Sequence, residues 1–268
     1  MAALSVWPKR YPIFSFFVLT FLILWATVIP QIALDRRWGW LAGIGGFCPA
    51  FAATVMSGIL EGKAGIEKLL AQLFRWRVGI QWYVIASLGS VLLVALAILF
   101  SYLLGGSARL AEINRIVSML PGQLPMLAII FLYQLAIMWG EEMGWRGFAQ
   151  PRLQAGHSAL VASVVIGVLW GVWHLPMFWI PDTLQYGLSI PFYIAATVGY
   201  SILFAWIYNS TQSVLLATVV HSADNTIVAY MNLYFPSITR EPLPSLLALG
   251  ALVVLVVALT GPKRLARV

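Results

Sequence analysis

The sequence predicts an all-α membrane protein that crosses the bilayer several times, and its composition and hydropathy carry this prediction. Of the 268 residues, 61% are hydrophobic and only 9% are charged, whereas a soluble domain has about 25% charged residues. The mean hydropathy is +0.90. Apolar runs long enough to cross a bilayer as helices recur along the chain. We therefore expect an all-α polytopic protein with about eight transmembrane helices in a single integral-membrane domain, residues 1–268.

The first apolar run, residues 11–34, directly follows Lys9 and Arg10. It is longer than the apolar region of a signal peptide, and it shows no small-residue cleavage motif. We interpret it as an uncleaved first span. Seven further runs are found at 38–60, 80–104, 124–148, 158–180, 188–208, 213–233 and 243–261. The run at 124–148 is continued through a charged stretch because no strong stop interrupts it.

Two connections, residues 61–79 and 107–121, are longer than simple turns, and the first has a clear pattern. Residues 61–79 alternate charged side chains with Leu69, Leu70, Leu73 and Phe74 at helical spacing. A helix with one charged face and one apolar face lies in the plane of a membrane surface. We expect residues 61–79 to form an interfacial amphipathic segment.

The distribution of basic residues predicts the orientation. Eight spans place both termini on one side, and the segments on that side hold Lys9, Arg10, Lys63, Lys68, Arg75, Arg77, Arg146, Arg152, Lys263, Arg264 and Arg267. The other side holds Arg36, Arg37, Arg109, Arg115 and Arg240. Loops rich in Lys and Arg stay in the cytoplasm. We therefore expect both termini to be cytoplasmic, in a bacterial or archaeal cell membrane.

Charge and cysteine content bear on other classes of protein. The net charge is +7, which in a soluble protein would suggest nucleic acid. Here the basic loops account for it, and the sequence has no patch of arginines and aromatic residues of the nucleic-acid-binding type, so we expect no nucleic-acid partner. Cys48 is the only cysteine, which excludes an intramolecular disulfide.

Three stretches place polar side chains inside predicted spans. They are Glu141-Glu142-x-x-x-Arg146, Trp170-x-x-x-His174 and His221-x-x-x-Asn225. An ionisable group in hydrocarbon costs about 2.5–3.5 kcal/mol on insertion scales, so each such group needs a partner or a function.

Helical spacing divides the first stretch into two parts. Glu142 and Arg146 are i and i+4 with the acid nearer the N-terminus, which favours an ion pair. Glu141 points about 100° away from Glu142 and lacks that partner. The stretch therefore predicts a structural ion pair beside a spare carboxylate.

The two histidines lie on two other spans. His221 and Asn225 are one turn apart and share a helix face, and Asp224 could orient the ring of His221. Trp170 lies one turn before His174, where it would form an aromatic wall.

The predicted boundaries leave these groups at unequal depths. Glu141 and His221 would lie about 10–15 Å from the inner face, and His174 near about 25 Å in a straight helix. The groups converge only if the fifth span tilts or starts late, or if the boundaries are wrong.

These residues have one structural interpretation and several chemical interpretations, and the sequence leaves all of them open. A buried histidine is often only an interhelical hydrogen-bonding group, but one spare carboxylate, two histidines and an amide on three helices exceed what packing needs. Glu with His can activate a water as general base. His and Asn on one face can donate hydrogen bonds to a developing oxyanion. Glu141, His174 and His221 could instead bind zinc with an open fourth position, although the sequence has no H-E-x-x-H signature.

In order and spacing, the three stretches resemble the motifs of the CAAX prenyl endopeptidase and bacteriocin-processing family of intramembrane proteases, also called the Abi family. The family motifs are E-E-x-x-x-R, F-x-x-x-H and H-x-x-x-N, and Trp170 stands where the family usually has Phe. The resemblance covers about residues 126–231. It implies an eight-helix peptidase with a conical or bundled intramembrane cavity open to the cytoplasm. The implied roles are Glu141 and His174 as water-activating groups, His221 and Asn225 as oxyanion hole, and Glu142 and Arg146 as supporting residues.

The functional expectation is an intramembrane endopeptidase of the glutamate type, with its catalytic core at about residues 124–233. Its substrate would be a peptide or protein reached from the membrane or the cytoplasmic side. No cofactor is required in the favoured mechanism, with zinc as the alternative. Two other functions use the same buried residues: a transporter or proton relay, and a non-catalytic immunity or scaffold protein. The broken helices in repeated halves that would favour a transporter are not seen.

Overall fold

The computed structural model describes residues 7–34, 45–106, 110–181, 183–235 and 242–266, and within these ranges the chain forms helices and no strand. The α-helices are α2 (Pro12–Ala33), α4 (Cys48–Leu73), α5 (Ile80–Leu103), α6 (Leu110–Glu142), α7 (Gln150–Gln154), α8 (Ala159–Trp173), α9 (Ile190–Thr211), α10 (Val214–Tyr234) and α12 (Pro242–Thr260). A π-helical segment, η1 (Met143–Ala149), joins α6 to α7, and a 3₁₀ helix, η2 (Leu175–Trp179), follows α8. The predicted all-α polytopic fold is confirmed.

Each of the eight expected spans has a counterpart helix, and seven helical segments in the described ranges are long and apolar enough to cross a membrane. The remaining counterpart is α4, which corresponds to the expected span at 38–60. Residues 38–44 of that span lie outside the described residues. The helix also does not end at residue 60, because α4 continues to Leu73.

A bend at Gly62 divides α4 into an apolar half and an amphipathic half. The backbone of Gly62 has φ 61° and ψ −148°, a conformation open essentially to glycine alone. After the bend, Gly65, Leu69 and Leu73 are buried at four-residue spacing, so one face of the helix packs inward. The expected amphipathic segment 61–79 is thus helical as far as Leu73, and its place at a membrane surface remains a prediction.

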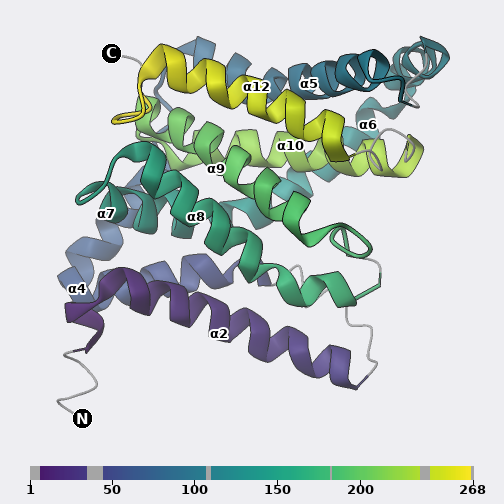
Figure 1. The fold of residues 1–268 in the computed structure, drawn as a ribbon. Helices are drawn as coiled ribbons and strands as arrows, with labels where there is room; N and C mark the ends of the chain where they lie inside the picture. Colours follow the sequence, from purple (N-terminus) through teal and green to yellow (C-terminus); the bar gives the residue numbers. More distant parts are fainter. Residues whose placement is uncertain (1–6, 35–44, 107–109, 182, 236–241, 267–268) are drawn as a thin grey trace.

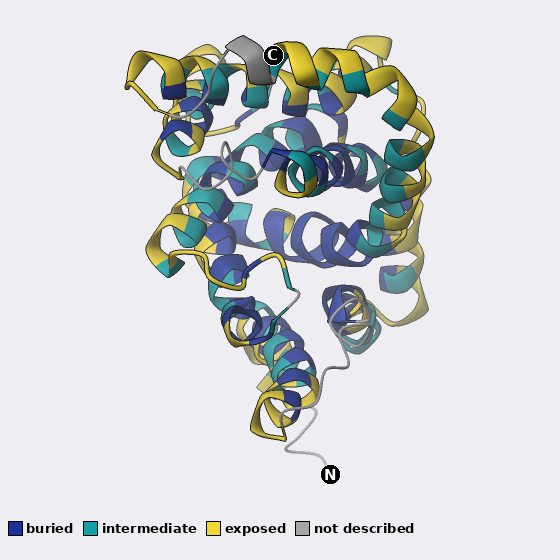
Figure 2. Cartoon of the chain, turned by 90° about the vertical axis from the view of Figure 1, so that its right-hand side faces the viewer, coloured by how far each residue is buried: buried dark blue, intermediate teal, exposed yellow. Residues whose placement is uncertain are grey.

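The long helices run alternately in opposite directions (Figure 1). The start of α2 and the end of α12 lie at the same end of the molecule, on the left of the view, together with α7 and the amphipathic half of α4. Viewed along the helices, the buried faces point to the middle and the exposed faces form the rim (Figure 2). The spans with the largest buried shares are those of α10 and α8. His221 lies on α10, and His174 directly follows α8.

The fourth span is longer than the expected 124–148. A helical run continues from Ile113 to Gln154 through η1. Glycines on this run allow α4 and the turn before it to approach closely: a Cβ built on Gly140 would lie 2.6 Å from the Gly46 carbonyl oxygen, and one built on Gly144 would lie 2.3 Å from Cβ of Pro49 on α4. Small residues four apart are a common device for close helix packing in membranes.

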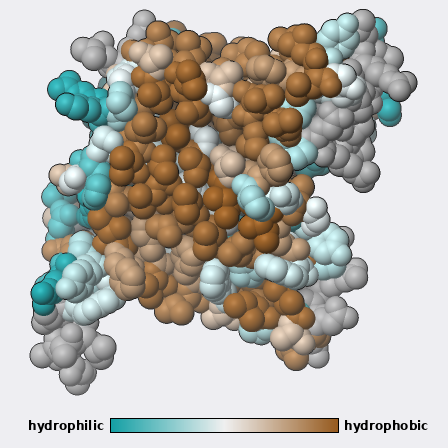
Figure 3. All heavy atoms as spheres, in the orientation of Figure 1, coloured by the Kyte–Doolittle hydropathy of each residue, from teal (hydrophilic) through white to brown (hydrophobic). Residues whose placement is uncertain are grey.

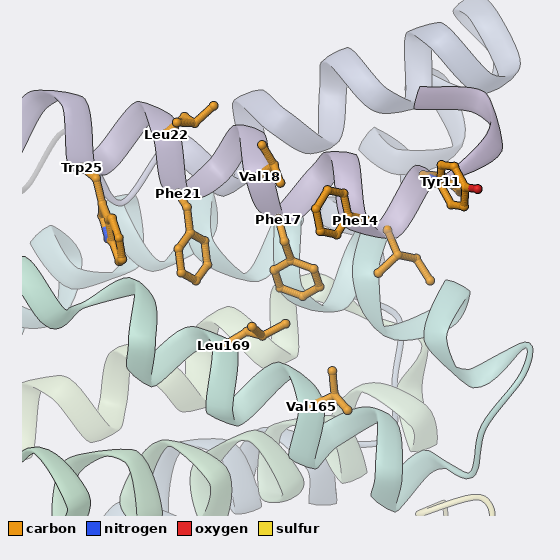
Figure 4. A pocket seen from close by; sticks show the side chains of 11 residues that line it. Tyr11, Phe14, Phe17, Val18, Phe21, Leu22, Trp25, Val165 and Leu169 are labelled. Carbon is orange, nitrogen blue, oxygen red and sulfur yellow. The ribbon is translucent and has the colours of Figure 1, made fainter. Parts of the chain in front are cut away.

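The surface has the polarity expected of a membrane protein. Apolar residues cover the middle of the face seen in Figure 3, and hydrophilic residues gather at its left edge. An apolar groove lies between α2 and α8. In Figure 4, Phe17, Phe21 and Trp25 point from α2 toward α8, where Val165 and Leu169 form the opposite wall.

Candidate active site

Glu142 is the centre of a fully buried charged group. Its Oε1 accepts a hydrogen bond from Nη1 of Arg146 at 2.9 Å, which is the predicted i, i+4 ion pair. The same oxygen lies 2.8 Å from Nδ1 of His221 on α10. The Arg146 guanidinium also lies over the ring of Phe204, 5.2 Å from its centroid. Glu142 therefore links the first motif to the third as well as to Arg146.

The partner of His221 fixes its tautomer. An ionised carboxylate can only accept, so Nδ1 of His221 carries the proton. In the neutral ring Nε2 is then an acceptor, and it becomes a donor only in the imidazolium form. Asp224, which the sequence suggested could orient this ring, lies near enough to His221 for an electrostatic interaction and also interacts with the hydroxyl of Tyr200.

Glu141 is not the unpartnered carboxylate that helical spacing suggested. Its Oε2 accepts hydrogen bonds from two indole N–H groups, that of Trp170 at 2.8 Å and that of Trp145 at 3.3 Å. Both indoles are neutral, so Glu141 has hydrogen-bond partners without a countercharge among them. The side chain of Glu141 is only 4% exposed.

His174 lies at the end of α8, where the helix changes into η2. Its Nδ1 lies 2.9 Å from the carbonyl oxygen of Trp170, one turn earlier. A carbonyl only accepts, so Nδ1 carries the proton and Nε2 of the neutral ring is left with its lone pair. This is the form of the ring that can take a proton from water.

Trp170 joins the three motifs. Its ring centroid lies 5.9 Å from that of His174 and 5.1 Å from that of His221, and its indole N–H holds Glu141. The structure thus brings Glu141, His174 and His221 to one tryptophan. The helix boundaries reduce the expected difference in depth between Glu141 and His174: Glu141 lies 13 residues, or about 20 Å, before Gln154, and His174 lies 15 residues, or about 22 Å, after Ala159.

Asn225 lies one turn after His221 on α10, at the edge of this group. Its Nδ2 donates to Sδ of Met138 at 3.1 Å and approaches Oε1 of Gln134 at 3.5 Å. Both acceptors come from α6. Because a thioether is a weak acceptor, this amide can exchange it for a stronger one.

The zinc alternative depends on which ring nitrogens of the two histidines are free. Among the described residues, no group of three His, Cys, Asp or Glu side chains is placed to hold a metal ion. Nδ1 of His221 is directed at Glu142 and Nδ1 of His174 at the carbonyl of Trp170, so within the described part of the chain both Nε2 atoms are free, as they are in histidines that ligate metals. The zinc alternative through Glu141, His174 and His221 therefore stays a prediction.

Sequence reasoning missed three features of the site: the two indole donors on Glu141 and the bond from His221 to Glu142. Trp145 is i+4 from Glu141, the same spacing that predicted the pair of Glu142 and Arg146, so this contact had a signal in the sequence. The contacts of Trp170 and His221 join different helices, and local spacing carries no information about them.

The comparisons with known proteins agree with the motifs. The family model described as type II CAAX prenyl endopeptidase Rce1-like matches residues 123–227, a range that includes all six predicted site residues. A curated relative, CAAX prenyl protease 2 of Methanococcus maripaludis, is 29% identical over 140 residues. This match covers 49% of the chain and spans 50% of the relative. The resemblance predicted from the three motifs is confirmed over this part of the chain.

Proposed function

We propose that this chain is an intramembrane endopeptidase, as its resemblance to the CAAX prenyl endopeptidases suggests. One observation carries the proposal: Glu141 and His174, on different helices, are both held by Trp170, at a buried position between apolar helices. A carboxylate and an imidazole with a free Nε2 can together remove a proton from water. A buried site keeps this water apart from bulk solvent and strengthens its electrostatic interactions.

The proposed reaction is attack of the activated water on the carbonyl carbon of a peptide bond. Glu141 and His174 take the water proton and return it to the leaving amine. The negative charge that develops on the carbonyl oxygen needs donors. Asn225 supplies its amide N–H, and His221 supplies Nε2–H in the imidazolium form. Glu142 and Arg146 support this step, since Glu142 holds Nδ1 of His221 and Arg146 holds Glu142.

The substrate class is a peptide or protein, and the relative named CAAX prenyl protease 2 makes prenylated peptides the first candidates. The groove between α2 and α8 supports approach from the membrane. Trp25 lines this groove, and its indole N–H donates to the carbonyl oxygen of Trp173, the residue before His174. An apolar chain lying in the groove would place an attached peptide beside the site.

The experiment is mass spectrometry of products from a peptide library, prenylated and unmodified, incubated with the protein in liposomes. We expect Glu141→Gln and His174→Gln to lower turnover at least about 100-fold, within the range that general base catalysis contributes. His157→Gln is the matched control, because His157 is exposed and its ring bonds, among the described residues, to the carbonyl of Leu153 in its own turn.

A parallel incubation with a strong chelator tests the metal alternative, and undiminished cleavage supports the glutamate mechanism. Full turnover by either Gln variant would refute the assigned roles. A pH-gradient-dependent flux across the liposome membrane without any peptide product would identify a transporter instead. If both Gln variants fail to fold and the wild-type protein shows no cleavage activity, the result would favour a scaffold function.

A further inference from the structure

We infer that the indole N–H groups of Trp145 and Trp170 form a clamp that positions Glu141, so that one carboxylate oxygen is fixed and the other faces the reacting water. The inference rests on the proposed function, and it assigns positioning roles to two residues that packing alone would not require. Trp170 belongs to the second motif and Trp145 to the first. The clamp therefore fixes the positions of these two motifs relative to each other.

Both indole bonds end on the same atom. Nε1 of Trp170 and Nε1 of Trp145 reach Oε2 of Glu141 at 2.8 and 3.3 Å, from α8 and η1 respectively. The last torsion of a glutamate side chain is broad and roughly two-fold, so a free carboxylate exchanges its two oxygens readily. Two donors on one oxygen remove this equivalence. Oε1 is then the oxygen that accepts the water.

The indoles are themselves held in place. Trp145 is completely buried and stacks on Phe17, with ring centroids 5.9 Å apart and planes 20° apart. Its ring also meets Trp173 edge-on at 5.7 Å. Trp170 is 5% exposed and lies against Phe204 and the ring of His221. Close packing on all sides fixes both donors before substrate arrives, which is what a preorganised site requires.

Trp170 has a second contact that makes the clamp specific to the reaction. Its carbonyl oxygen accepts from Nδ1 of His174, while its side chain donates to Glu141. One residue thus holds both proposed water-activating groups, through its main chain and its side chain. Phe at this position would keep an aromatic wall and the main-chain contact, and would lose only the bond to Glu141.

The test removes the N–H and keeps the ring. Trp145 and Trp170 are replaced one at a time by Phe and, by unnatural amino-acid incorporation, by benzothienylalanine, in which sulfur replaces the indole N–H. We expect kcat to fall about 10- to 100-fold for each, with KM changed by less than about twofold, because the lost bond to a charged group serves the chemical step. Trp206→Phe is the matched control: its indole nitrogen is buried without a hydrogen-bond partner among the described residues, and its ring packs against Trp82.

Full kcat in the benzothienylalanine variants would overturn the clamp and leave these tryptophans as packing residues. A rise in KM with kcat unchanged would also overturn it, because it would assign them to substrate binding. A second readout is independent of activity. The resonance Raman band that reports indole N–H hydrogen bonding is compared between the wild type and Glu141→Ala, with Trp170→Phe and Trp145→Phe to assign the contributions.

We expect Glu141→Ala to shift the contributions of both indoles toward the free N–H position. An unchanged band would refute the clamp even if the enzyme proves active. A shifted band in a protein that cleaves no peptide would uphold the clamp and reject the proposed function, so the two failures are distinguishable.

Discussion

At the scale of single residues, the buried charges are arranged around Glu142 more than around Glu141. Glu142 accepts from Arg146 and from His221 on the same oxygen, and its second oxygen is buried without a hydrogen-bond partner among the described residues. The Nε atom of Arg146 is also buried without a hydrogen-bond partner among the described residues. A buried ion pair with unsatisfied atoms is poor evidence for stability, because desolvation offsets much of its attraction. This pair is better explained by the orientation it imposes on His221.

The first prediction concerns the cost of breaking this pair. Arg146→Met should lower the free energy of unfolding by about 3–5 kcal/mol, because it leaves an uncompensated carboxylate in the core. Adding Glu142→Gln should restore part of the loss, because the carboxylate left without Arg146 is then neutral. Thermal unfolding in detergent measures both. If the double variant loses the sum of the two single losses, the two side chains do not act as a pair.

The residues that could be predicted from the sequence are those whose signal is local. Glu142 with Arg146 follows from i, i+4 spacing, and His221 with Asn225 on one face follows from the same rule. The contacts of Glu141 were only partly predicted. Helical spacing separated it from the pair of Glu142 and Arg146, but the indole of Trp170 reaches it from another helix, and no spacing rule states which side chains of different helices meet.

At the scale of elements, the site depends on how closely α4 approaches the run that carries the first motif. That run passes from α6 through η1 into α7, and π-helical turns of this kind are often found at functional sites. In η1 the side chains of Trp145 and Arg146 are both completely buried. The sequence predicted a helix here but placed its end at residue 148. The helical run continues further because packing against neighbouring helices, and not hydropathy alone, decides where a buried helix ends.

The second prediction tests this close approach. A Cβ built on Gly144 would lie 2.3 Å from Cβ of Pro49 and 2.8 Å from its carbonyl oxygen, so Gly144→Ala must push α4 away from η1. Overpacking of this kind costs about 1–3 kcal/mol. We expect a clear fall in melting temperature. Gly122→Ala is the matched control, since Gly122 lies on α6 with nothing within 4 Å of the added atom. An equal effect of both changes would contradict the packing explanation.

At the scale of the whole molecule, contacts at one end of the bundle join α4 to α7 and the start of α8 to the chain after α12. Nη2 of Arg152 on α7 contacts Glu61 at 3.1 Å, and the Ala159 N–H donates to the carbonyl of Lys263 at 3.0 Å. The neighbouring ammonium of Lys68, which donates to Glu61, holds the pKa of that carboxyl below its ordinary value. The carboxylate therefore keeps its charge, and its contact with Arg152, to a lower pH than an isolated glutamate would.

The alternation of eight helices could be predicted from apolar run lengths, because a bilayer fixes how long a spanning helix must be. The order in which the helices pack could not, because lipid-facing and protein-facing apolar residues have the same hydropathy. The central positions of α8 and α10 had one signal in the sequence, namely their histidines, since polar residues in spans face the interior.

The last prediction concerns the orientation of the whole molecule. Lys63 lies in the amphipathic half of α4, at the end of the bundle that holds most of the basic residues, and Ser118 lies near the start of α6 at the opposite end (Figure 1). Both positions are exposed. With Cys48 changed to Ala, Lys63→Cys and Ser118→Cys each provide a single thiol. Basic loops remain cytoplasmic, so a membrane-impermeant maleimide should label the Ser118→Cys protein in intact cells. The Lys63→Cys protein should react only after the membrane is permeabilised. The reverse pattern would place both termini outside, and labelling of both proteins in intact cells would contradict the alternation of the spans.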